Sequence, residues 1–140
     1  MKYGAHVFVW QDRYGDDELR RILDDAAAWG LSFLEVAVGD DIQFNASKLG
    51  DEANARGLEL VFSPGGAWPV ECDISLTDER HRAAGLDWHR RAIERSATAG
   101  ASAYPGAIYG HPGTVQRRRL SESDNRRIAG MLRQLAEAAA

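Results

Sequence analysis

The chain has 140 residues, with 17 Lys and Arg, 21 Asp and Glu, four His and one Cys. This length is that of one domain, and 44% hydrophobic with 27% charged residues is typical of a folded globular protein. A net charge of −4 argues against a general nucleic-acid binder, and one cysteine excludes both an internal disulfide framework and a cysteine-rich zinc site. No apolar run is long enough to span a membrane, and the start lacks a signal-peptide pattern. We therefore expect a cytoplasmic protein whose residues 1–140 form a single domain.

Strand-like and helix-like patterns alternate four times along the chain. The first strand is predicted over Tyr3–Trp10, and Asp16 is the expected N-cap of a helix that ends at Gly30. The second strand, Leu31–Val38, is almost continuously apolar, as strands covered on both faces are. A short helix follows over Ser47–Arg56. The apolar stripe of the first helix is Leu19, Ile22, Leu23, Ala26 and Trp29.

The third unit begins with a predicted strand over Leu58–Ser63. Ser75 and Asp78 match a capping box, which predicts a long helix from Thr77 to about Ala99. Its two histidines are assigned to solvated faces, and its apolar stripe includes Ala84, Trp88, Ala92 and Ala99.

The fourth unit begins with a predicted strand over Ala101–Tyr109, in which Pro105 is an unfavourable interior residue. Ser121 and Asp124 repeat the capping pattern before the last helix. The run Arg117–Arg119 lies in the loop just before Ser121 and is interpreted as a solvated loop or partner contact. The apolar stripe of the last helix is Ile128, Met131, Leu132, Leu135 and Ala139.

This alternation predicts an α/β fold of four βα units with a parallel sheet and right-handed crossovers. The loops that follow the strands are long, namely residues 11–15, 39–46, 64–74 and 110–120. Ligands of α/β folds bind at the carboxyl ends of the strands, so these loops are where a site is expected. A complete eight-unit barrel needs roughly 250 residues, which leaves a small open sheet or half of a barrel.

Five residues stand out chemically, and each has a structural alternative. Glu35 lies inside an apolar strand, where a carboxylate either enters a polar pocket or is satisfied by the backbone or an arginine. His6 either is a satisfied core residue or lines a pocket. Trp10 and Tyr14 lie at or beyond the end of the first strand, and they either stack on a sugar ring or form a hydrophobic lid. His111, in a Gly/Pro loop, is either a turn residue or a ligand contact.

Several segments that follow one another along the chain resemble segments of one family in the same order. The chain resembles the ketose 3-epimerase branch of the xylose-isomerase-like sugar isomerase/epimerase family. The matching segments are Met1–Gly4 with Trp10 and Tyr14, Trp29–Ala37, Asp73–Asp78 leading into Arg82–Gly85, and Pro105–Tyr109.

The resemblance implies the N-terminal half of a (β/α)8 TIM barrel that interconverts free or phosphorylated ketoses. It implies proton transfer through an enediolate between two glutamates, with a divalent Mn, Mg or Co ion as cofactor. By resemblance, His6 lines the sugar pocket, Tyr14 takes an aromatic lid position, and Glu35 takes the acidic position at the end of the second strand. Ser63 and Ala107 fall where the third and fourth strands contact the sugar.

The chain also departs from the family. The metal ligands and both catalytic glutamates of the family come from strands 5 to 8, so we expect no catalytic or metal-ligating residue among these 140. His111-Pro112 replaces the Trp-Pro that often follows the fourth strand.

The expected partners are a sugar or sugar phosphate and either a C-terminal half barrel or a second copy of this chain, with no nucleic acid and no membrane. Whether the chain is an enzyme alone stays open. One alternative is a non-catalytic four-stranded α/β domain that binds a ligand or partner, and another is a homodimer of paired half barrels. Polarity of the face that would line the barrel discriminates these readings, and Val7, Val9, Val36 and Val61 predict that this face is partly apolar.

Overall fold

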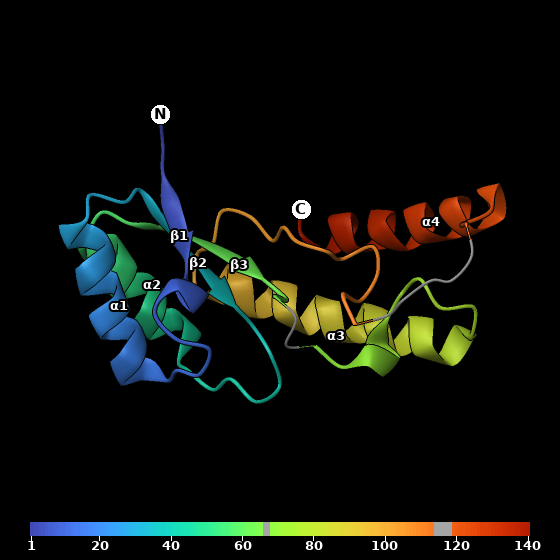
Figure 1. The fold of residues 1–140 in the computed structure, drawn as a ribbon, viewed down its shortest axis with the longest axis horizontal. Coiled ribbons are helices and arrows are strands. Elements are labelled where there is room, and N and C mark those ends of the chain that lie inside the picture. The colour runs from blue at the N-terminus through green and yellow to red at the C-terminus, as the bar shows by residue number, and fades with distance from the viewer. Residues whose placement is uncertain (66–67, 114–118) are drawn as a thin grey trace.

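The computed structural model describes residues 1–65, 68–113 and 119–140 and follows the predicted alternation of strand and helix (Figure 1). Strands β1 (Gly4–His6), β2 (Phe33–Ala37) and β3 (Glu59–Ser63) form a parallel sheet in the order β1-β2-β3. Of the basic run at 117–119, residues 117 and 118 lie outside the described part of the chain.

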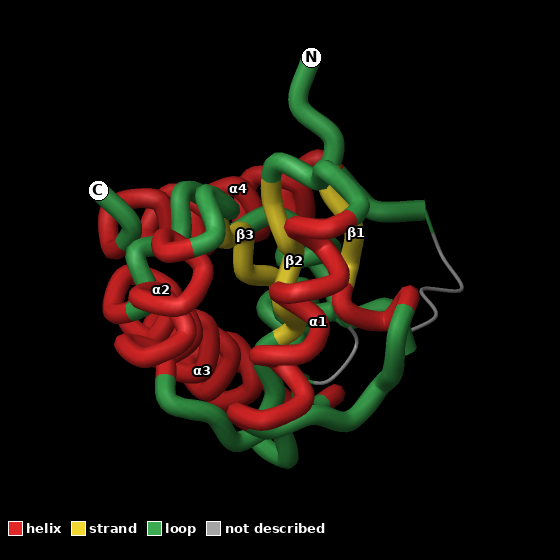
Figure 2. The backbone as a smooth tube through the Cα atoms, turned by 90° about the vertical axis from the view of Figure 1, so that its left-hand side faces the viewer, coloured by secondary structure: helices red, strands yellow, loops and turns green. Residues whose placement is uncertain are grey.

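The described part of the chain also forms four α-helices and two short 3₁₀ helices. Figure 2 shows α1 in front of the strands, with α2 and α3 to one side. None of the helices in the described ranges is both long and apolar enough to cross a bilayer. The bounds are α1 Asp16–Ala28, α2 Ala46–Ala55, α3 Glu79–Thr98, α4 Glu122–Ala138, η1 Val7–Val9 and η2 Val70–Cys72.

Alternation along β2 and β3 divides the side chains between two faces. Leu34 and Val36 of β2 are fully buried in a core shared with the helices, as are Leu60 and Phe62 of β3. Because successive residues of a strand point to opposite faces, the intervening residues face away from the helices. The helices therefore cover one face of the sheet and leave the other open.

The open face is less apolar than the sequence predicted. Val7 and Val36 lie in the helix-facing core, and only Val61 of the four valines lies on the open face of a strand. Val9 has left the sheet in η1 and is 64% exposed. Val7 and Val9 differ because the expected first strand, Tyr3–Trp10, ends at His6 and η1 follows. Val36 differs because alternation along β2 places it on the same face as Leu34.

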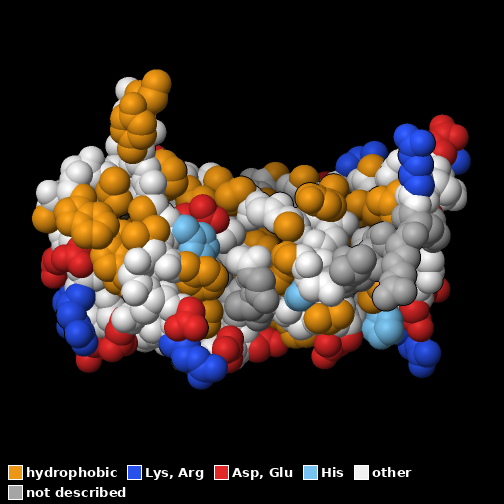
Figure 3. Space-filling model, in the orientation of Figure 1, with side chains coloured by type: hydrophobic (Ala, Val, Ile, Leu, Met, Phe, Trp, Pro, Cys, Tyr) orange, Lys and Arg blue, Asp and Glu red, His pale blue; other side chains and the backbone are white. Residues whose placement is uncertain are grey.

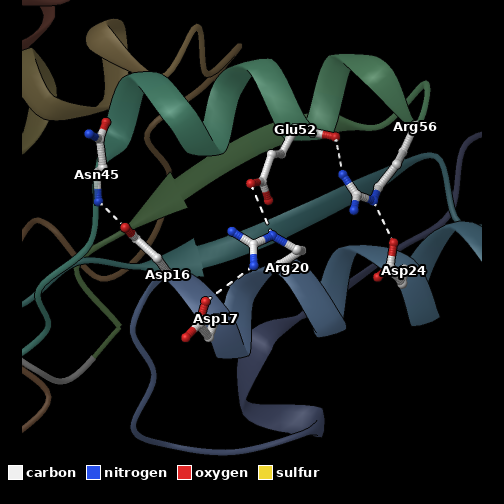
Figure 4. A network of polar contacts seen from close by, with 7 residues as sticks. All are labelled: Asp16, Asp17, Arg20, Asp24, Asn45, Glu52 and Arg56. Atoms are coloured by element: carbon white, nitrogen blue, oxygen red, sulfur yellow. Dashed lines mark hydrogen bonds and ion pairs between the residues drawn. The ribbon is translucent and has the colours of Figure 1, made fainter.

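Helices α1 and α2 are joined by a polar network on their outer surface (Figure 4). Arg20 Nε lies 3.2 Å from a Glu52 carboxylate oxygen, and Arg56 Nε lies 2.7 Å from Asp24 Oδ1. These pairs are partly exposed, so each contributes little, about 0–1 kcal/mol. Their main effect is to fix how the two helices lie beside each other over the core.

The helix starts differ in detail from the prediction. Asp16 is the first residue of α1 rather than its cap, and it accepts a hydrogen bond from the Asn45 N–H across to α2. Asp78 is itself the N-cap of α3, whereas Ser75 lies outside the helix. The capping box predicted at Ser121 is present in α4, where the Ser121 hydroxyl accepts from the Asp124 N–H.

The fourth strand is reduced to a short extended segment beside β3. Ser102 donates its N–H to Leu60 O, and Phe62 donates to Ala103 O. A regular parallel ladder would have used Ser102 O for the second bond, so one residue is bulged out. The next donor in the shifted register falls on Pro105, which has no N–H. The predicted strand Ala101–Tyr109 therefore stops after its first residues.

A second hydrophobic cluster joins α3 and α4, which lie alongside each other (Figure 1). Ile93 of α3 and Leu135 of α4 are buried in it. Tyr104 of the fourth segment packs against both this cluster and the main core. Of the stripe predicted for the third helix, Trp88, Ala92 and Ala99 are buried, whereas Ala84 is exposed and its neighbour Gly85 is buried instead.

Two glycines inside helices provide a test of this packing. A Cβ at Gly85 would lie directly against Cys72 O and 2.8 Å from Ile74 Cγ2, whereas a Cβ at Gly130 would meet nothing closer than 3.9 Å. We expect Gly85→Ala to lower the free energy of unfolding by about 2 kcal/mol or more. Gly130→Ala should raise it by about 0.5–1 kcal/mol through helix propensity. Urea unfolding of both variants measures this, and equal effects would contradict the packing of α3 on η2.

Candidate functional site

The open face of the sheet is arranged in layers set by the strand register. Gly4, Phe33 and Glu59 are level with one another at the amino-terminal end. The Phe33 ring occupies the space that a side chain at Gly4 would need. Lys2 pairs with the Glu59 carboxylate beside it. An aromatic ring and an ion pair therefore cover this end of the face.

The middle layer brings two of the predicted residues together. His6 is paired with Glu35 and Glu35 with Val61 in the register, so their side chains lie abreast. His6 Nε2 is 3.9 Å from Glu35 Oε1. The His6 side chain is 25% exposed and the Glu35 side chain is 30% exposed. His6 Nδ1 accepts a hydrogen bond from the Phe8 N–H at 3.1 Å. In a neutral imidazole this leaves the proton on Nε2, facing the carboxylate.

A cleft of about 440 Å³ opens at the carboxyl end of this face, lined by His6, Phe8, Glu35, Ser63, Gly65 and Gly106. In the space-filling view, histidine and acidic side chains lie among hydrophobic ones near the strands (Figure 3). A carboxylate, an imidazole and a hydroxyl beside an aromatic wall match a ligand with several hydroxyl groups and an apolar ring face.

Ser63 carries the clearest sign of a missing polar contact. The residue is 2% exposed, and its Oγ has no hydrogen-bond partner among the residues that the structure describes. A buried hydroxyl without a partner costs about 1–3 kcal/mol, so such groups are usually satisfied by something. The residue lines the cleft, so a polar group that reached the hydroxyl there would satisfy it.

Sequence analysis missed three residues of this cleft. Phe8 lies two residues after His6, and its ring packs edge-on against the imidazole at 4.4 Å. Gly65 follows the end of β3, and Gly106 follows the short extended segment beside it. The signal that was available is their position in the loops after β3 and the fourth segment.

The structure does not place Trp10 or Tyr14 in the cleft. Trp10 stacks on Trp29 with ring centroids 4.9 Å apart and donates its indole N–H to Asp25. Tyr14 is buried and donates its hydroxyl to Ala37 O at 2.6 Å. Burial raises the pKa of this phenol, and the hydrogen bond to the backbone opposes the rise. Both rings hold loops against the core.

His111 and Ala107 line a neighbouring cavity of about 330 Å³, next to α4. His111 is buried, accepts from the Gly113 N–H through Nδ1, and therefore donates through Nε2 to Trp68 O at 2.8 Å. Its two ring nitrogens thus connect the backbone at Trp68 with the backbone at Gly113. This is the turn role that the sequence left open as one alternative.

His89 is the residue whose environment the sequence misjudged most. The imidazole is fully buried, packs 4.6 Å from the Trp68 ring, and shares a hydrogen bond with the Tyr104 hydroxyl at 3.0 Å. Burial lowers its pKa to about 4, against the opposing influence of Asp73. Its position at helical spacing from Leu86 and Ile93 was the available signal for burial.

The residues of the cleft do not by themselves fit a divalent metal. Within residues 1–65, 68–113 and 119–140, no three His, Cys, Asp or Glu side chains gather. His6 and Glu35 supply two candidate ligands at most. Divalent metals of the Mg and Mn class take six ligands, several of them oxygens, and so we derive no step through a metal from this chain.

Comparison with known proteins places this geometry in context. No protein-family model matches the chain. Over 144 aligned residues the chain is 28% identical to an L-ribulose 3-epimerase from Methylomonas sp. (strain DH-1), with the whole chain covered and 48% of that protein. The chain thus spans about half the length of the curated relative it matches.

Solved structures agree with this match. A D-allulose 3-epimerase from Methylomonas sp. in complex with D-allulose superposes with a TM-score of 0.86 and 25% identity, over the whole chain and 48% of its own length. An L-ribulose 3-epimerase structure gives a TM-score of 0.88 and 26% identity over 99% of the chain and 46% of its length. The neighbours are TIM-barrel epimerases, so the predicted half barrel and the resemblance to ketose 3-epimerases are confirmed.

The buried His89 predicts a specific dependence of stability on pH. Its pKa in the folded chain, about 4, lies below the ordinary value of 6.5, so the unfolded chain binds the proton more readily. The stability that His89 contributes is complete above pH 6.5 and is lost as pH falls toward 4, by about 3 kcal/mol in total. The difference in unfolding free energy between wild type and His89→Gln should change by this amount between pH 7 and 4. His81→Gln, on the exposed side of the same helix, should run parallel to wild type, and parallel curves for both variants would contradict the assignment.

Proposed function

We propose that this chain, which resembles one half of a ketose 3-epimerase barrel, is the N-terminal half of a sugar isomerase/epimerase and forms the substrate-facing wall of its pocket. The observation that carries the proposal is the coverage of the match, since the whole chain superposes on about half of an epimerase that holds D-allulose. The cleft of His6, Glu35 and Ser63 supports it with the right chemistry for a sugar.

The proposed ligand is a ketose or sugar phosphate in the cleft on the open face. Ser63 Oγ donates to a sugar hydroxyl, while Glu35 accepts from another and the Nε2–H of His6 donates to a third. The Phe8 ring packs on a carbon face of the sugar. Val61 and Phe33 lie on the same open face outside the lining of the cleft, so this face is partly apolar and partly polar.

We assign proton transfer to a complementary half barrel. Epimerisation next to a carbonyl passes through an enediolate and needs a base on each face of the reacting carbon. Glu35 and His6 on one wall supply groups that bind and orient the hydroxyls. The catalytic glutamates and the ligands of a Mn, Mg or Co ion belong to the other half, which is further chain or a second polypeptide. The 1–140 unit acts as one body in this assembly, with Tyr104 joining its two hydrophobic clusters.

A titration with ketoses tests the binding role directly. D-Allulose and L-ribulose, added to the ¹⁵N-labelled chain, should shift the amide resonances of residues 6, 35 and 63. We expect weak binding, because an open half barrel buries less of the sugar than a closed pocket does. Shifts elsewhere only, or none up to saturating sugar, would refute the assignment of this cleft.

Ser63→Ala separates binding from folding. Because Ser63 Oγ has no partner among the described residues, its removal should leave the free energy of unfolding unchanged or slightly raised. The dissociation constant for the ketose should rise about 5- to 10-fold with the loss of one hydrogen bond. Ser96→Ala is the matched control, since this buried serine on α3 donates to Ala92 O and lies outside the cleft. A Ser63→Ala variant that binds ketose like wild type would show that the hydroxyl does not contact the sugar.

A further inference from the structure

A second cavity lies between the segment that follows β2 and helix α3. It has a volume of about 230 Å³, and residues between Val38 and Gln43 form one side of it while α3 forms the other. None of the residues that line it belongs to the cleft of His6, Glu35 and Ser63. The chain therefore has a cavity at the carboxyl end of β2 that the proposed function does not use.

Two arginines of α3 line this cavity from successive turns of the helix. Arg91 and Arg95 are four residues apart, so they lie on the same side of α3. Neither pairs with a carboxylate within residues 1–65, 68–113 and 119–140, whereas Arg90 beside them pairs with Asp87. In a chain with a net charge of −4, two guanidinium groups without a carboxylate partner at one cavity favour an anionic ligand.

The guanidinium of Arg95 is held in place by neutral partners. Its Nη1 and Nη2 both donate to Ile42 O at 3.1 Å, and Nη2 also donates to Phe44 O at 3.2 Å. The group lies over the Phe44 ring, 3.9 Å from the ring centroid. These contacts fix the orientation of the guanidinium without compensating its charge, and they leave further N–H donors of the group unused.

Arg91 and Trp88 provide the other walls of the cavity. Arg91 is exposed, and in the described part of the chain it makes no hydrogen bond or ion pair, so all its donors are available. Trp88 is buried and donates its indole N–H to Asp40 Oδ1 at 2.9 Å. Asp40 is the only acidic residue among the described residues that line the cavity. The two arginines therefore outweigh its charge.

The size and the donors of the cavity select a small anion. The volume of about 230 Å³ is smaller than the pockets of about 300–1,000 Å³ that hold drug-sized ligands. Planar guanidinium groups match the oxygens of a phosphoryl group, which accept paired hydrogen bonds from arginine. A phosphoryl group has three such oxygens and about two negative charges, so it engages both arginines at once.

We propose that this cavity binds a phosphoryl group between Arg91 and Arg95, as inorganic phosphate or as the phosphate of a phosphorylated metabolite. Arg95 provides donors that are already oriented, Arg91 closes on the anion from the exposed side, and Trp88 forms an apolar wall. The inference is independent of the proposed function, because this cavity and the sugar cleft share no lining residue.

Titration with inorganic phosphate tests the site on the 140-residue chain. At pH 7 and constant ionic strength, phosphate should shift the amide resonances of residues 39, 40 and 43 and the indole resonance of Trp88 in the ¹⁵N-labelled chain. We expect a dissociation constant of about 1 mM, as two charge-assisted contacts give. Absence of these shifts up to about 50 mM phosphate, or shifts at other residues only, would overturn the proposal.

Three charge variants separate this cavity from the general charge of the chain. Arg91→Gln should raise the dissociation constant for phosphate at least about 5-fold. Arg90→Gln removes the same charge from the neighbouring residue, which does not line the cavity, and should change the constant less than about twofold. Asp40→Asn removes the repelling charge, while its amide oxygen still accepts from Trp88, and should lower the constant about 3-fold.

The variants also define what contradicts the site. Equal effects of Arg91→Gln and Arg90→Gln, or weaker phosphate binding by a folded Asp40→Asn variant, would show that the anion is not held in this cavity. Circular dichroism of each variant establishes that it is folded. The amides of residues 6, 35 and 63 report the sugar cleft separately, so a chain that binds ketose but not phosphate keeps the proposed function and loses only this site.

Glycerol 3-phosphate identifies the source of the phosphoryl group, because it carries the group on a short carbon chain and is not a ketose. A dissociation constant at least about 10-fold below that of phosphate, with the same resonances shifted, would support a phosphorylated metabolite as the ligand. Similar constants would support free phosphate. Binding of glycerol 3-phosphate that Arg91→Gln leaves unchanged would overturn the assignment of the phosphoryl group to this arginine pair.

Discussion

Burial of every second side chain of β2 and β3 against the helices is the constraint on which the rest of the structure depends. Leu34, Val36, Leu60 and Phe62 must face α1, α2 and α3, and a shift of one residue would expose all four. Because this register is fixed, Glu35 is fixed on the opposite face beside His6. The polar groups of the cleft are positioned by apolar contacts that lie on the other side of the sheet.

The same constraint explains why the open face carries polar groups that the helices do not cover. No helix of the described chain covers the face, so its carboxylate and imidazole are partly exposed. The Ser63 hydroxyl is hidden from water without a described partner, and β1 presents unpaired backbone to the outside. Both features are unfavourable for an isolated domain, and a bound polar ligand and a neighbouring strand would each relieve one of them.

Much of the fold followed from periodicity, because hydrophobic alternation and glycine stops are local signals. Gly30 and Gly100 end α1 and α3 with positive φ, as expected from residues that adopt this conformation without strain. Glu35 and His6 stood out because a polar residue within an apolar strand is unusual. What failed depended on contacts distant in sequence. The ladder lost at Pro105 needed the register against β3, and the placement of Trp10 needed the end of α1. Burial of His89 differs, because its helical spacing from buried neighbours was a local signal.

The Phe33 ring that lies over Gly4 has a kinetic consequence. With the Lys2–Glu59 pair beside it, this ring closes the amino-terminal end of the open face, whereas the cleft lies at the other end. A sugar in the proposed pocket then enters and leaves through one mouth. Exchange of a ligand in the proposed pocket would then depend on the segments at that mouth, which include Gly65 and Gly106.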